Sequence, residues 1–97
     1  MLQIDPTIND TGFSGLKVTK LWASSSCETL LISLEKGHTF PEHTSPRDAL
    51  LVLLEGKVLF RINNSEIEIN KHEVFSFKAE TPHNVFADKN SKFLIIR

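Results

Sequence analysis

The chain has 97 residues, of which 40% are hydrophobic and 24% are charged, and its formal net charge at pH 7 is −1. This length and composition fit a globular protein, so we expect a single domain over residues 1–97. Lys and Arg are scattered along the chain rather than clustered. The sequence therefore predicts no basic surface for nucleic acid or for an anionic membrane.

Cys27 is the single cysteine of the sequence, which excludes an intrachain disulfide and a thiolate metal cluster. We interpret it as a small buried residue at the start of a strand rather than as a nucleophile. No apolar stretch approaches the ~20 residues that cross a bilayer. Residues 1–10 lack the basic start and apolar core of a signal peptide. The expected location is therefore the cytoplasm.

The first fourteen residues are polar and rich in turn-forming residues, among them Pro6, Asn9, Asp10 and Gly12. Such a composition favours turns over regular elements. We expect an irregular N-terminal arm over residues 1–14, in a position to lie across a neighbouring chain.

After the arm, short β-type segments alternate with turns, and no segment has a helical period. Asn63 and Asn64 tolerate positive φ and are expected to close a tight hairpin. Short strands separated by turns at intervals of about 8–12 residues indicate an all-β sandwich or barrel. The expected strands span residues 15–23, 27–34, 49–54, 57–62, 65–70, 74–77, 84–87 and 92–97.

The segment over residues 49–54 is unusual because it is apolar throughout, without polar alternation. Both faces of this strand are therefore expected to be buried. One barrel has only one interior, so the second face needs another cover. A second subunit in a symmetric homodimer is the favoured cover, and the N-terminal arm of the same chain is the alternative.

Residues 37–56 and 71–83 together resemble the two motifs of the cupin family, G-x5-H-x-H-x3,4-E-x6-G and G-x5-P-x-G-x2-H-x3-N. The resemblance extends from about residue 30 to residue 97, and it depends on the combined spacing of the motifs. It implies a cupin-type double-stranded β-helix, which is a jelly-roll barrel. The matching residues are Gly37, His43 and Gly56 in the first motif and Pro82 and His83 in the second.

The departures from the motifs concern the metal site that the resemblance implies. Metal-binding cupins use three histidines and a glutamate around one divalent ion, whereas this chain has Ser45 and Ala49 at two of those positions. Metal centres generally need three protein ligands, so an Fe, Mn, Zn or Ni ion is less favoured than no cofactor. In the second motif, the departures are His72, Lys78, Glu80 and Ala87.

Two further residues are candidates for a third ligand beside His43 and His83. His38 lies five residues before His43, an odd spacing that places the two on opposite faces unless Pro41 breaks the strand. Asp48 would point inward only with a one-residue bulge, and we interpret it as a solvated carboxylate in a turn. His72 is expected to be exposed in a turn as well.

The barrel mouth is the expected site of function, because an apolar pocket with a few polar groups is typical of small-molecule sites. His43 and His83 are expected to point into it. Phe60, Phe86 and Phe93 are interpreted as core. The candidate pocket residues are Ser45, Ala49, Leu51, Leu53, Phe40, Phe75 and Phe77.

These residues lead to several functional hypotheses. The favoured one is a small-molecule-binding or sensing module with a reduced metal site. The alternative is a metal-dependent enzyme of the oxygenase or isomerase kind that uses His43 and His83 as ligands. Metal-free acid–base catalysis by one of these histidines ranks third, because no carboxylate at a matched position orients the ring. A purely structural role as a dimerising subunit is left open.

Overall fold

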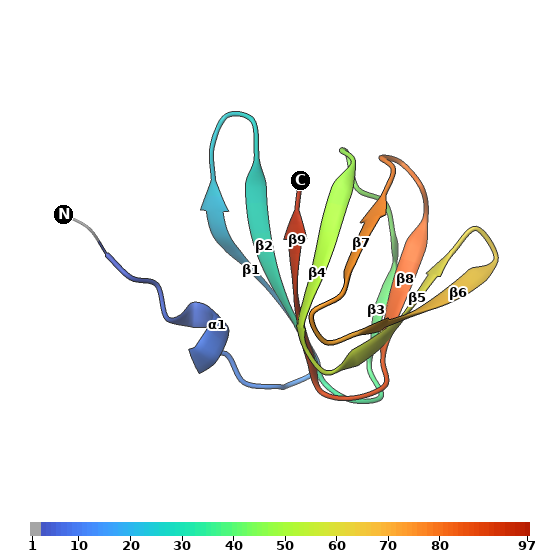
Figure 1. Cartoon of the computed structure of the whole chain (residues 1–97), viewed down its shortest axis with the longest axis horizontal. Coiled ribbons are helices and arrows are strands. Elements are labelled where there is room, and N and C mark those ends of the chain that lie inside the picture. Colours follow the sequence, from blue (N-terminus) through green and yellow to red (C-terminus); the bar gives the residue numbers. More distant parts are fainter. Residues whose placement is uncertain (1–2) are drawn as a thin grey trace.

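The computed structural model describes residues 3–97 and shows two antiparallel β-sheets that face each other (Figure 1). One sheet has five strands in the order β1-β2-β9-β4-β7, and the other has four in the order β3-β8-β5-β6. The all-β prediction is thus confirmed. The strands are β1 (Leu16–Ala23), β2 (Glu28–Leu34), β3 (Thr39–His43), β4 (Ala49–Glu55), β5 (Lys57–Ile62), β6 (Ser65–Asn70), β7 (Val74–Phe77), β8 (His83–Ala87) and β9 (Ser91–Ile96).

Strand β3 is the one strand that the sequence analysis did not predict. Pro41 lies at its centre and removes a backbone donor, which argues against a strand when the sequence is read alone. The structure accommodates Pro41 because β3 is an edge strand, paired only with β8. The pairing is irregular between Phe40 and His43, as expected where a proline interrupts the ladder.

The predicted hairpin between β5 and β6 is confirmed. Asn63 and Asn64 have φ values of 51° and 60°, and Ile62 pairs with Ser65 across the turn. Two consecutive residues with positive φ are typical of the two-residue turns that match the twist of adjacent strands.

The N-terminal arm is not wholly irregular, so that prediction is wrong for part of it. Thr7–Asp10 forms a one-turn helix, α1. Pro6 precedes it, and the Asp5 carboxylate accepts a hydrogen bond from the backbone N–H of Thr7 at 3.0 Å. A preset φ and a satisfied N-terminal donor both favour a helical turn.

The arm folds back onto its own chain at one place. Ser33 Oγ donates a hydrogen bond to Gly12 O at 2.7 Å, and Lys92 Nζ donates to Ile8 O at 2.7 Å. Ser33 and Lys92 are paired on β2 and β9 and are buried. The arm therefore covers the outer face of these two strands, and its contact with a neighbouring chain stays a prediction.

Strand β4 was expected to be buried on both faces, and one face fulfils this within the chain. Ala49, Leu51 and Leu53 point into the core, whereas the alternate residues Leu50, Val52 and Leu54 are only half-buried. The hydrogen bonds of the arm given above go to Ser33 on β2 and Lys92 on β9. The core between the sheets comprises Ile32, Leu34, Ala49, Leu51, Leu53, Val58, Phe60, Ile69, Phe77, Val85, Ala87, Phe93 and Ile95.

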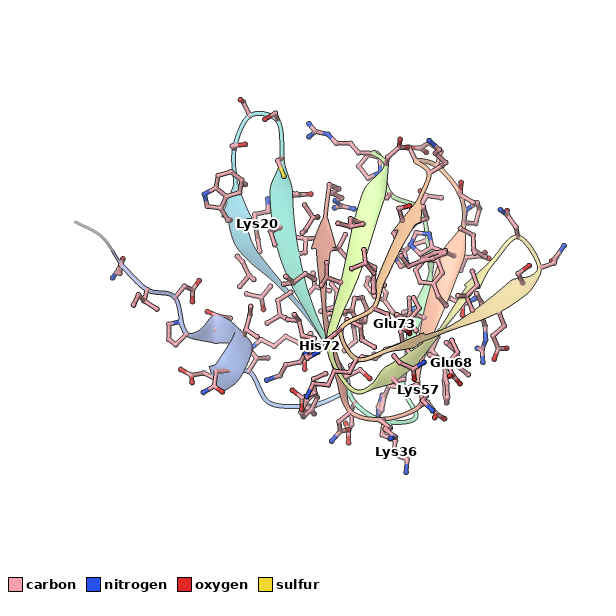
Figure 2. All side chains as sticks on the ribbon, in the orientation of Figure 1. Lys20, Lys36, Lys57, Glu68, His72 and Glu73 are labelled. Carbon is pink, nitrogen blue, oxygen red and sulfur yellow. The ribbon has the colours of Figure 1, made fainter. Side chains whose placement is uncertain are left out.

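The two sheets converge at one end of the molecule, the end at which β4 leads into β5 (Figure 1). Gly56 makes this crossing with a φ of 89°, and a Cβ there would overlap Asn90 O and Ser91. Ser91 Oγ accepts a hydrogen bond from Lys57 N at 3.1 Å. Figure 2 shows Lys57 and Glu68 near this closed end, where Lys57 Nζ lies 3.9 Å from Glu68 Oε1.

At two positions where this chain departs from the second motif, the backbone still has the positive φ that glycine favours. His72 and Glu80 occupy positions at which the motif has glycine, and their φ values are 70° and 62°. Both backbone N–H groups are used, since His72 donates to Leu53 O at 2.7 Å and Glu80 donates to Ser45 O at 2.8 Å. The chain thus adopts the left-handed conformation at both positions without the residue that favours it.

We expect His72→Gly and Glu80→Gly each to raise the free energy of unfolding by about 0.5–1 kcal/mol. Relief of the left-handed penalty exceeds the added flexibility of the unfolded chain. Lys71→Gly is the control, because Lys71 has no positive φ, and it should leave stability unchanged or lower it. Urea unfolding measures all three. A loss of stability in both test variants would contradict the expectation.

Candidate functional site

His43 and His83 meet at the open end of the molecule, opposite Gly56. They are direct partners in the β3–β8 ladder, so their side chains lie on the same face. Their ring centroids are 4.3 Å apart with an interplanar angle of 64°. The structure therefore brings together the two histidines that the motifs singled out.

The backbone fixes the orientation of both imidazoles. Nδ1 of His43 lies 2.6 Å from Pro41 O, and Nδ1 of His83 lies 2.8 Å from Thr81 O. A carbonyl oxygen only accepts, so each neutral ring donates from Nδ1. The lone pair then remains on Nε2, and each neutral histidine offers a hydrogen-bond acceptor or a ligand atom at that nitrogen.

His83 is enclosed by aromatic rings and is 3% exposed. The Phe60 ring stacks on it at 5.1 Å, and the Phe77 ring lies at 4.6 Å. Burial lowers the pKa of His83, and the charge of nearby His43 lowers it further, against the opposing effect of the Thr81 carbonyl. His83 is therefore neutral at pH 7.

A cavity of about 260 Å³ opens beside the two histidines. Five predicted residues line it, namely Phe40, His43, Ser45, Phe77 and His83. The walls are otherwise mostly apolar and come from both sheets. The sequence analysis missed Val18, Leu30, Ile32, Thr44, Phe60, Val85, Phe93, Ile95 and Arg97 as lining residues. The apolar positions among them lie on β1, β2, β5, β8 and β9. The β-type pattern of these strands is the signal that could have found them, and that pattern does not distinguish a cavity-lining residue from a core residue.

Four predicted pocket residues do not line this cavity, and the prediction is corrected for them. Leu51 and Leu53 are fully buried, because β4 lies between β9 and β7 and its inner face is filled by core side chains. Ala49 lies beside Asp48 at a separate, shallow hollow. Phe75 packs on Phe60 with ring centroids 4.9 Å apart.

The structure does not bring either candidate third ligand to the histidine pair. His38 precedes β3 at the closed end, where its Nε2 lies 3.5 Å from Glu35 Oε1. Asp48 accepts a hydrogen bond from Ala79 N at 2.8 Å and lies 3.7 Å from Lys78 Nζ. Over residues 3–97, no group of three His, Cys, Asp or Glu side chains is arranged to hold a metal ion.

Ser45 takes the place of the second histidine of the motif, and its hydroxyl is already engaged. It donates to Arg47 O at 2.7 Å. The donor set at the open end therefore consists of two imidazoles, whereas catalytic metal centres generally have three protein ligands. These residues do not fit the four-ligand centre of a metal-binding cupin.

Arg97 is a site residue that no motif indicated. It lines the cavity, its Nε donates to Glu28 Oε2 at 2.7 Å, and its Nη1 lies 3.4 Å from Ser45 Oγ. The hydrogen bond from Arg97 lowers the pKa of Glu28, with a smaller contribution from Lys20. A cation thus lies at the cavity wall, next to the histidine pair.

A second, wider hollow of about 470 Å³ lies on the outer face of the four-stranded sheet. Arg61, Glu66 and Asn84 contribute to it, and Asn84 Oδ1 is buried without a hydrogen-bond partner. The Arg61 guanidinium stacks over the Phe86 ring, so Phe86 faces outward. The prediction that Phe86 is a core residue is therefore wrong. This hollow is open and polar and does not include either histidine of the pair.

The comparisons with known proteins identify the family. The Cupin domain family matches residues 30–96, and the chain belongs to the cupin family. An RmlC-like cupin from Desulfovibrio desulfuricans superposes with a TM-score of 0.86 at 19% identity, covering 99% of this chain and 95% of that one.

Two further structures share the fold. A conserved protein of unknown function from Streptococcus pyogenes gives a TM-score of 0.82 at 21% identity, over 98% of this chain and 84% of its own. A cupin superfamily protein from Desulfitobacterium hafniense gives a TM-score of 0.81 at 20% identity, covering 90% of this chain and 80% of its own. The comparison with curated proteins found no match. In the described part of the chain, no helix has the length and apolar character needed to cross a membrane.

The lowered pKa of His83 leads to a pH prediction. Unfolded His83 titrates near pH 6.5, whereas the buried ring resists protonation. As the pH falls below 6.5, the unfolded state gains a proton that the folded state does not, so the free energy of unfolding falls. The slope reaches at most about 1.4 kcal/mol per pH unit from this group.

Denaturant unfolding between pH 5 and pH 8 measures this dependence. His83→Gln should reduce the slope, whatever its effect on overall stability. His72→Gln is the matched control, since His72 is exposed and should keep the wild-type slope. An unchanged slope in His83→Gln would show that His83 does not titrate as described.

Proposed function

We propose that this cupin is a small-molecule-binding or sensing module whose ligand occupies the cavity at the open end. The observation that carries the proposal is the pair of imidazoles, His43 and His83, whose Nδ1 atoms are tied to backbone carbonyls beside an apolar cavity. The ligand has a mostly apolar body and one hydroxyl or N–H donor, which binds at Nε2 of the histidine pair.

The shape and lining of the cavity support a ligand of limited size. A volume of about 260 Å³ lies just below the ~300–1,000 Å³ of typical ligand pockets. It suits one ring or a short branched chain. The stacked contacts of Phe40 with His43 and of Phe60 with His83 hold the imidazoles in fixed orientations, so little ordering is required when the ligand binds.

One observation favours a second candidate function, a metal-dependent enzyme that uses His43 and His83 as ligands. Histidine ligands almost always donate their other ring N–H to a carbonyl or carboxylate, as both rings do here. The small donor set weighs against it, because His38 and Asp48 lie elsewhere. Acid–base catalysis ranks third, since no carboxylate is among the described lining residues to orient either ring.

We also propose a homodimer formed through the outer face of the five-stranded sheet. Val52 on β4 pairs with Leu94 on β9 and with Val74 on β7, so the three side chains form one apolar patch. Val74 is 57% exposed in the single chain. Contiguous exposed apolar patches mark interaction sites, and a symmetric dimer is the commonest assembly.

The binding proposal is tested by ¹H–¹⁵N NMR titration with three neutral hydroxyl probes: phenol, 4-hydroxyphenylacetamide and 3-methylbutan-1-ol. We expect chemical-shift changes at the cavity residues with at least one probe. Val18→Trp should weaken that binding about tenfold or more, because Val18 lines the cavity but is 48% exposed and can be enlarged without disturbing the core. Lys17→Trp is the control, because Lys17 lies on the opposite face of β1, and it should not weaken the binding of the probe. Absence of shifts at the cavity with all three probes would contradict the proposal.

The dimer proposal is tested by size-exclusion chromatography with light scattering. Wild-type protein should elute as a dimer, and Val52→Lys should elute as a monomer, because burying an unpaired ammonium at the interface is unfavourable. Leu59→Lys is the control, an outward position on β5 of the other sheet, and it should remain dimeric. A monomeric wild-type protein at micromolar concentration would overturn the proposal.

A further inference from the structure

We propose that the ligand of the open-end cavity is a carboxylate, and that Arg97 binds its carboxylate group. This inference rests on the proposed binding function and adds the chemical class of the ligand. It follows from the position of Arg97, from the charges around the cavity mouth and from the polarity of the histidine pair.

The Arg97 guanidinium has N–H groups that are not used in hydrogen bonds within the described structure. It carries five N–H groups in a planar fork. In the described structure, one of them bonds to Glu28 through Nε, and a second lies at 3.4 Å, a long distance, from Ser45 Oγ. The remaining N–H groups have no hydrogen-bond partner among the described residues. A carboxylate is the group that matches a guanidinium fork with two parallel hydrogen bonds.

Three cations, Lys20, Arg47 and Arg97, lie near the cavity mouth. Lys20 Nζ lies 3.4 Å from Glu28, so Glu28 is shared between two cations, Lys20 and Arg97. Arg47 adds a third cation, placed on this rim by its hydrogen bond to Ser26 O at 2.9 Å. Besides Glu28, two carboxylates lie near these cations: Asp48, which is paired with Lys78, and Glu80, whose backbone N–H donates to Ser45 O at 2.8 Å. Of these charged side chains, Arg97 is the one that lines the cavity, so an anion that enters the cavity is attracted to Arg97.

The cavity wall strengthens this attraction. Arg97 is the one permanently charged residue among the described lining residues, and most of its neighbours there are apolar. A hydrogen bond between opposite charges is stronger beside such a wall than in water. Ser45, at the position of a motif histidine, contacts the guanidinium instead of offering a metal ligand.

The histidine pair determines which part of the ligand lies at Arg97. In the neutral form, a histidine whose Nδ1 donates to a carbonyl presents a lone pair at Nε2, which repels a carboxylate but accepts a hydrogen bond from a hydroxyl or N–H group. The carboxylate therefore lies at Arg97, and the donor of the ligand lies at the histidines. The ligand class is a small carboxylic acid with an apolar body and a separate hydroxyl or N–H group.

The test compares 4-hydroxyphenylacetate with 4-hydroxyphenylacetamide, which have nearly the same shape and hydroxyl but differ in charge. Isothermal titration calorimetry or NMR titration gives the two dissociation constants. We expect the wild-type protein to bind the acid on the order of tenfold more tightly than the amide, as for hydrogen bonds between charged groups. Arg97→Gln should abolish this preference while still binding the amide. Arg97→Lys should keep part of the preference, and Arg47→Gln, the matched control, should keep most of it.

The possible failures of the two proposals are distinguishable. Equal binding of acid and amide by the wild-type protein, or an undiminished preference in Arg97→Gln, would overturn the carboxylate inference and leave the binding function standing. Failure of both compounds to bind the wild-type protein would overturn the inference together with the binding function for this ligand class. Thermal unfolding of Arg97→Gln and Arg97→Lys shows whether each variant is folded, and the Lys variant gives the decisive comparison if the Gln variant is not.

Discussion

The structure depends on a close backbone contact between two chain crossings at the closed end. At Gly56 the chain passes from the five-stranded sheet to the four-stranded sheet, and at Asn90 and Ser91 it returns. The two crossings touch so closely that no Cβ fits at position 56, and the Ser91 hydroxyl ties them together through Lys57. Because the sheets are joined here, their strands diverge towards the other end (Figure 1), where a cavity remains.

At the open end, the cupin fold is retained while part of the metal-ligand set of the motifs is replaced. Register in the β3–β8 ladder places His43 opposite His83, so the pair is a consequence of strand pairing rather than of loop conformation. Ser45 lies where the motif has a histidine and contacts the Arg97 guanidinium. In the function proposed above, the Arg97 guanidinium supplies the positive charge that a metal ion supplies in a metal-binding cupin. The proposal is therefore that this site holds an organic anion.

Period-two alternation and turn residues predicted the fold well, because both are local properties. Asn63-Asn64 closes its hairpin as expected, whereas β3 was missed because Pro41 argues against a strand unless its edge position is known. Motif spacing predicted His43 and His83 for the same local reason. Arg97 was not predicted, because its role arises from the pairing of β9 with β2, which brings it to Glu28. Contacts between strands distant in sequence leave no local pattern.

The most direct test of this account is the metal content of the wild-type protein, purified without chelators and without a nickel affinity tag. Elemental analysis is run beside the His43→Ala, His83→Ala double variant. The account expects Fe, Mn, Zn and Ni far below one ion per chain in both proteins, because two imidazoles form an incomplete donor set. Close to one ion per chain in the wild-type protein, lost in the double variant, would contradict the account and would favour the metal-dependent enzyme.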